Sequence, residues 1–162
     1  FGAGVFMYVG LLALTMARHF LGAPVEGKMT PTLWVHLAPL SVIPLSMLAL
    51  LKTTGDASLL RYGSLVAAAF LGAALWWLVL AVSMTIRNRR QGKLPFALSW
   101  WALVFPIGAC SVLAYRVSEL LALEVLPLVA SGLTLLTLFV WSATALGTVR
   151  GIRTGAIFAP AH

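Results

Sequence analysis

The chain has 162 residues, of which 61% are hydrophobic and only 9% are charged. A water-soluble domain of this size with so much apolar surface would aggregate, so the composition predicts an integral membrane protein. The formal net charge of +7 has two interpretations, because membrane topology enriches Lys and Arg in cytoplasmic loops and a basic vestibule would also concentrate anions.

Five apolar runs follow one another along the chain, each near the roughly 20 residues that a helix needs to cross the hydrocarbon core. They predict transmembrane helices over residues 1–17, 31–51, 60–86, 96–114 and 125–149. The runs are too long for the strands of a transmembrane β-barrel and do not alternate in polarity. The expected fold class is all-α integral membrane, with residues 1–162 forming a single transmembrane domain.

The first run begins at Phe1, with no initiator Met and no basic start of a signal peptide. An odd number of helices with this beginning indicates the C-terminal portion of a larger protein. We therefore expect the chain to be a fragment.

Lys and Arg are shared unevenly between the two ends of the predicted helices. One side receives eight of them: Arg18, Lys28, Arg87, Arg89, Arg90, Lys93, Arg150 and Arg153. The other side receives three: Lys52, Arg61 and Arg116. Because short cytoplasmic loops carry the excess of positive charge, the first side, which includes the C-terminus, is predicted to be cytoplasmic.

The second run contains Pro39 and Pro44, and the fourth contains Pro106. A proline removes the hydrogen bond to the carbonyl four residues earlier and bends the axis. The carbonyls expected to lose their donors are those of Val35, Leu40 and Ala102. Both runs are therefore predicted to be bent helices.

The other three runs carry no proline in their middle, and the third has Ser64, Ala68 and Gly72 spaced by four, which favours close helix packing. Bent and smooth helices thus alternate along the chain. The functional interpretation is that the bent helices line a cavity and the smooth ones surround them. The alternative is that proline is simply more frequent in membrane helices.

The fourth run, within "LPFALSWWALVFPIGACSVLAYR", has no charge between Leu94 and Tyr115. At 100° per residue, Phe105 shares a face with small and aliphatic side chains, and Gly108 lies at its edge. The others on this face are Leu98, Ala102, Ala109 and Val112. A large ring beside Pro106 therefore stands out from a shallow stripe, either as a knob in a packed core or as an obstruction in a cavity.

Neither an enzyme nor a metal protein is indicated. The acids, Glu26, Asp56, Glu119 and Glu124, lie in loops or at the ends of the runs, and no catalytic set shares one depth. Cys110 has no partner for a disulfide and is interpreted as a small packing residue. A metal site would require His19 and His36 to meet; we expect none, and for His36 a polar partner or access to water. No cofactor and no nucleic-acid partner are expected.

The quoted stretch resembles a signature near the C-terminus of the tellurite-resistance/dicarboxylate transporter family, which includes TehA-like proteins and slow anion channels. The matching residues are Pro95, Phe96, Ser99, Trp100, Trp101, Phe105, Pro106, Gly108 and Ala109. A second match is "PTLWVHLAP", with Pro31, Thr32, Ala38 and Pro39, where Leu40 replaces a proline common in the family.

The resemblance implies a fold of ten helices in five hairpins, in which this chain would supply helices six to ten. It implies that Phe105 is a pore gate, and that Pro106, Ala102, Ala109, Gly108 and Pro39 line the pore or bend its helices. It further implies homotrimers in a cell membrane, the bacterial inner membrane, with both termini cytoplasmic. The partners would be small anions and the lipid bilayer.

The function expected from this resemblance is an anion channel or uniporter for small inorganic or organic anions. One alternative is a proton-coupled carrier that exports sulfite or a C4-dicarboxylate. Another is a structural membrane subunit without a pore.

Overall fold

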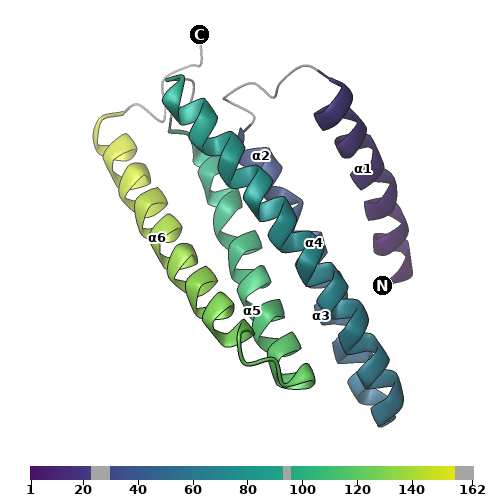
Figure 1. Ribbon diagram of the computed structural model, residues 1–162. Coiled ribbons are helices and arrows are strands. Elements are labelled where there is room, and N and C mark those ends of the chain that lie inside the picture. The colour runs from purple at the N-terminus through teal and green to yellow at the C-terminus, as the bar shows by residue number, and fades with distance from the viewer. Residues whose placement is uncertain (23–29, 93–95, 156–162) are drawn as a thin grey trace.

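The computed structural model describes residues 1–22, 30–92 and 96–155, in which the secondary structure is helical and no strand occurs (Figure 1). The helices run side by side and are joined by short connections. Their bounds are α1 Gly2–Leu21, α2 Thr30–Val35, α3 Leu37–Thr53, α4 Ala57–Arg90, the 3₁₀-helix η2 Leu98–Leu103, α5 Val104–Leu121 and α6 Leu126–Arg153.

Four helical segments are long and apolar enough to cross a membrane, and they match the last four predicted runs. They are Thr30–Thr53, Ala57–Arg90, Leu98–Leu121 and Leu126–Arg153. The first predicted run is helical as well, but its apolar part, Gly2–Arg18, is shorter. The helix of the fourth predicted run, 96–114, ends at Leu121, seven residues later than predicted, so Arg116 and Glu119 belong to the helix.

The alternation of bent and smooth helices is confirmed. The second span is divided at His36 into α2 and α3, and the fourth changes from 3₁₀ to α geometry between Leu103 and Val104. By contrast, α1, α4 and α6 are unbroken. Pro44 lies inside helix α3, which continues through it without a break.

The bent spans form the centre of the described fold. Helix α5 packs against α3, α4 and α6, while α2 packs against η2 and α4. In each bent span 39% of the most apolar window is buried, against 28% for α4 and 11% for α6. Helix α1 stands at the edge (Figure 1) and reaches the core through Tyr8.

Small residues bring α3 and α4 together, but on a different face from the one predicted. A Cβ added at Gly63 would overlap the Leu51 side chain of α3, and Ser64 and Ala67 are buried. Gly72, however, has no neighbour within 4 Å. A strict spacing of four turns the series about 40° per step away from the contact. The buried face instead continues through Ala67, Leu71, Ala74 and Trp77, in steps of three and four.

Hydrogen bonds from α1 and α4 stabilise the break at His36. Trp77 Nε1 of α4 donates to the Leu33 carbonyl at 2.7 Å, and the Tyr8 hydroxyl donates to the His36 carbonyl at 3.4 Å. The half-buried His36 ring packs edge-on against Trp77, with centroids 5.1 Å apart. Backbone carbonyls at a helix break in hydrocarbon need such partners, so these hydrogen bonds stabilise the break.

Further hydrogen bonds join α2 to the last turns of α4. Asn88 Nδ2 donates to Thr30 Oγ1 at 2.6 Å in a buried contact, and Trp34 Nε1 donates to Thr85 Oγ1 at 3.1 Å. The short helix α2 is thereby held at the end of the bundle where α4 terminates.

Charged residues lie at the two ends of the bundle. The end that contains the C-terminal turns of α1, α4 and α6 carries Arg18, Arg87, Arg89, Arg90, Arg150 and Arg153, and we call it the basic end (Figure 1). The opposite end carries Lys52, Arg61, Arg116, Asp56, Glu119 and Glu124. There Asp56 caps α4 by accepting hydrogen bonds from the amides of Ser58 and Leu59.

Candidate functional site

Phe105 is the second residue of α5, directly after the 3₁₀ turn. Its side chain is 65% exposed, whereas Pro106 and Ile107, the next two residues, are buried. The ring therefore projects away from the packed centre, although it stands on one of the two most buried spans. Within the described fold Phe105 is not a core knob.

The 3₁₀ turn corrects the predicted face of Phe105. With 3.0 residues per turn up to Leu103, Leu98 and Trp101 lie about 80° from Phe105 rather than close to it. Both turn toward α6: Leu98 shares a hollow with α6 residues, and Trp101 Nε1 donates to Thr148 Oγ1 at 3.1 Å. Uniform α-helical spacing, assumed in the sequence analysis, holds only from Val104 onward.

The remaining predicted neighbours flank the ring. Ala102 and Ala109 are half-buried, and Val112 is exposed two turns beyond Phe105. Gly108 faces α6, where an added Cβ would meet the Thr137 methyl group at 3.6 Å. The shallow stripe on either side of the ring thus consists of Ala102, Ala109 and Val112.

A hollow of about 420 Å³ continues this stripe toward the end of the bundle opposite the basic end. It is lined by Val112, Tyr115 and Arg116 of α5 and by hydroxyl-bearing residues of α6, including Ser131 and Thr134. The stripe that bears Phe105 therefore passes from an apolar ring to a surface with hydrogen-bond donors.

Hydrogen bonds hold the part of α5 beyond Phe105 against α6. Ser111 Oγ donates to the Ala130 carbonyl at 2.8 Å and lies 2.7 Å from Thr134 Oγ1. At the turn between the helices, Ser118 Oγ donates to the Leu123 carbonyl at 3.1 Å. These contacts make α5 and α6 a firmly joined hairpin.

The two irregular segments lie at the same level of the bundle. Helix α2 packs against η2, and α3 packs against α5. Pro39, half-buried in the first turn of α3, is therefore brought to the level at which Phe105 begins α5. Cys110 is fully buried in the core, as its interpretation as a packing residue predicted.

Sequence reasoning missed the aromatic contacts of this region. His36 was expected to have a polar partner or access to water, and its half-buried ring packs between Tyr8 and Trp77. The signal available was the set of aromatic residues with polar edges in three different runs. Among the described residues, no group of three or more His, Cys, Asp or Glu side chains can hold a metal ion.

Apolar spans, two central irregular helices and charges confined to the ends define a multi-pass helical membrane protein. Residues 1–149 match the voltage-dependent anion channel family, SLAC1, and the chain belongs to this family. The resemblance noted in the sequence is thereby confirmed.

Two curated relatives come from Methanocaldococcus jannaschii. The uncharacterized transporter MJ0576 is 31% identical over 157 residues, which cover 97% of this chain and 45% of the relative. The uncharacterized transporter MJ0762 is 30% identical over 157 residues, which cover 97% of this chain and 46% of the relative. The chain thus spans about half the length of these relatives. No solved structure matches the chain significantly. The family description and both names point to a channel or transporter, not an enzyme.

Proposed function

We propose that the protein is an anion channel or uniporter that passes small inorganic or organic anions through a central pore gated by Phe105. The observation that carries this proposal is the 65% exposed ring of Phe105 on one of the most buried spans. The ring projects from a face of the fourth span on which Ala102 and Ala109 are its small neighbours. A pathway that runs along this face would therefore be obstructed by the ring. Family membership supports an anion as the transported species.

In this proposal the chain supplies helices six to ten of a ten-helix, five-hairpin fold, and residues 1–162 act as one transmembrane domain. The coverage of 45% and 46% of the two relatives supports this. The spans divided at His36 and Leu103 belong to the inner ring of helices, and α1, α4 and α6 belong to the outer ring. Pro39, Pro106, Ala102, Ala109 and Gly108 shape or line the pore. The complete protein is a homotrimer with one pore per subunit.

The basic end faces the cytoplasm, because cytoplasmic ends of membrane helices carry the excess of Lys and Arg. The described spans place no Asp, Glu, Lys or Arg near their centres. A pore of this kind binds its ion weakly, so it selects by dehydration cost and by a diffuse positive potential. It favours weakly hydrated or delocalised anions.

Flux measurements separate the channel from a proton-coupled carrier of sulfite or C4-dicarboxylates. The complete protein is reconstituted in liposomes, and anion efflux is followed with and without a proton gradient. A channel or uniporter gives efflux that follows the anion gradient and the membrane potential alone. Efflux that requires the proton gradient would establish the carrier, and absence of any anion efflux would favour a structural subunit.

A further inference from the structure

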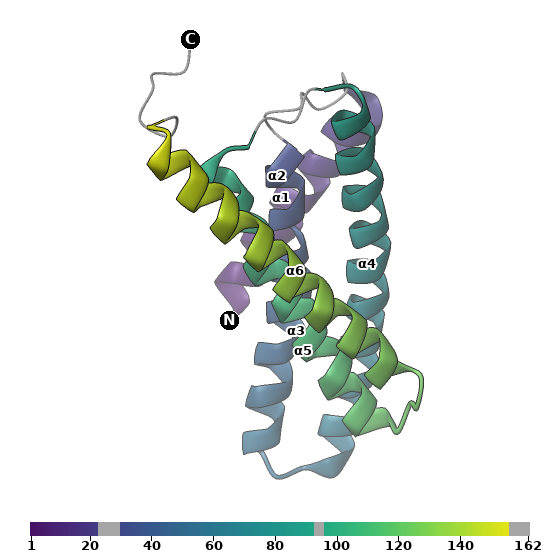
Figure 2. The same ribbon diagram turned by 90° about the vertical axis from the view of Figure 1, so that its left-hand side faces the viewer.

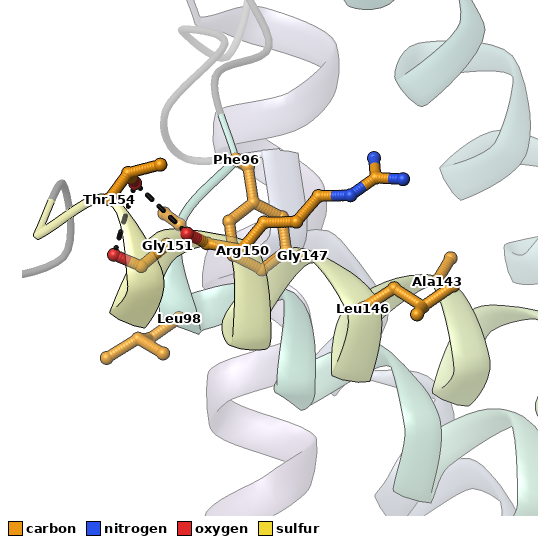
Figure 3. A pocket seen from close by; sticks show the side chains of 9 residues that line it. Phe96, Leu98, Ala143, Leu146, Gly147, Arg150, Gly151 and Thr154 are labelled. Atoms are coloured by element: carbon orange, nitrogen blue, oxygen red, sulfur yellow. Dashed lines mark hydrogen bonds between the residues drawn. The ribbon is translucent and has the colours of Figure 1, made fainter.

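A second hollow lies at the basic end, away from the Phe105 stripe. It has a volume of about 840 Å³ and lies between Phe96 and Leu98, at the start of the fourth span, and the C-terminal turns of α6 (Figure 3). Helix α6 crosses the bundle obliquely, so its C-terminal part leaves α5 (Figure 2). Leu98 lies about 80° from Phe105 around the helix axis, so this hollow is not part of the proposed pathway.

Apolar side chains form one part of the wall of the hollow. The Phe96 ring lies against Gly147, where an added Cβ would stand 2.5 Å from a ring carbon. Leu98 and Leu146 are 51% and 59% exposed. The absence of a side chain at Gly147 leaves room for the Phe96 ring. The exposed Leu98 and Leu146 side chains offer an apolar surface to a bound ligand.

Two arginines border this region. Arg150 lines the hollow, and Arg89 of α4 lines an adjoining hollow of about 460 Å³ that shares Phe96 and Ala143 with the first. In Figure 3 the Arg150 side chain runs back along α6, over Gly147 and in the direction of Leu146 and Ala143, which is the shared side. Long helical side chains ordinarily point in this direction.

Neither guanidinium is neutralised within the described part of the chain. The ion pair found there joins Arg116 and Glu119 at the opposite end. The acids of the described residues, Asp56, Glu119 and Glu124, also lie at that end. Among the described residues, an anionic group placed between Arg89 and Arg150 would therefore meet two cations and no competing carboxylate.

We propose that these two hollows bind an anionic phospholipid of the bilayer. The phosphate is held by Arg150 and Arg89, and an acyl chain lies along Leu98 and Leu146. Basic pockets between membrane helices at the headgroup level attract anionic lipids, and charged donors form the stronger hydrogen bonds to phosphate. A free inorganic anion makes no use of the apolar walls, whereas a phospholipid uses both features.

The test measures the thermal unfolding midpoint of the complete protein in neutral detergent. Phosphatidylglycerol, phosphatidylcholine with the same acyl chains, and inorganic phosphate are titrated separately. Phosphatidylglycerol is expected to raise the midpoint most, because a ligand that binds only the folded state stabilises it. Arg150→Gln is expected to weaken phosphatidylglycerol binding about fivefold, which corresponds to about 1 kcal/mol per cation near an anionic lipid.

Two further variants keep the test decisive. Ala143→Trp, at an exposed position shared by both hollows, is expected to abolish the lipid-specific shift by filling the space. Arg153→Gln removes the same charge from the same end of α6 without lining either hollow, and is expected to leave the shift nearly unchanged.

Four outcomes would overturn the proposal. Equal shifts with phosphatidylglycerol and phosphatidylcholine would show that the arginines do not recognise the headgroup. An equal shift with inorganic phosphate would assign the site to a free anion. Binding that survives both Arg150→Gln and Ala143→Trp would place the lipid elsewhere. The absence of any shift would show that these hollows bind no lipid in the complete protein.

Discussion

Phe105→Ala in the complete protein is expected to raise anion conductance with little loss of stability. The ring is 65% exposed, so about a third of its surface is covered. Truncation of a fully buried Phe costs about 3 to 5 kcal/mol, and the covered third therefore corresponds to about 1 to 2 kcal/mol. The same change removes the obstruction, because the residue left behind is as small as Ala102 and Ala109.

Two assays on one preparation measure these effects: anion current across planar bilayers and thermal unfolding in detergent. Ile107→Ala is the matched control, because Ile107 lies on the same helix and is fully buried. It is expected to lose about 2 to 5 kcal/mol and to gain no conductance. Trp101→Ala removes the hydrogen bond to Thr148 and is expected to lower stability while the pore stays closed.

The gating assignment is refuted by either of two results. If Phe105→Ala destabilises as much as Ile107→Ala and carries no added current, the ring is a packing residue in the complete protein. If Trp101→Ala opens the pathway and Phe105→Ala does not, the obstructing ring is that of Trp101.

Three other predictions concern the fold and its orientation. Asn88→Ala leaves the buried Thr30 hydroxyl without its 2.6 Å donor and is expected to cost about 1 to 3 kcal/mol, measured by thermal unfolding. A cysteine at Gln91, in the turn after α4, is expected to react with an impermeant thiol reagent only in inverted vesicles, and efficient labelling of intact cells would reverse the topology. Residues 1–162 reconstituted alone are expected to give no selective anion flux, because two inner helices cannot close a pore, and selective flux would contradict the proposed architecture.

The sequence predicted the spans well because hydropathy is a property of each segment by itself. Four of the five runs correspond to helical segments long enough to cross a bilayer, and the alternation of broken and smooth helices followed from the prolines. Proline identifies which carbonyl loses its donor. That information is local and needs no neighbour.

The exact form of each irregularity depends on contacts that no local pattern contains. The second span breaks at His36, where Trp77, 44 residues away from Leu33, donates a hydrogen bond to the Leu33 carbonyl. The fourth span tightens into a 3₁₀ turn, which rotates Leu98 toward α6 and leaves Phe105 on a different face. The identity of the candidate gate was accessible from the sequence, but its neighbours were not.

The 3₁₀ turn also sets the depth of the ring within its span. From Leu98 to Phe105 the axis advances about 13 Å, with five steps at 3₁₀ rise and two at α rise, whereas from Phe105 to Leu121 it advances about 24 Å. In the proposed pathway the ring would thus divide the span into a short inner vestibule at the basic end and a longer outer one. A blocking anion applied from the basic end would have roughly half as far to travel to the ring as one applied from the opposite end.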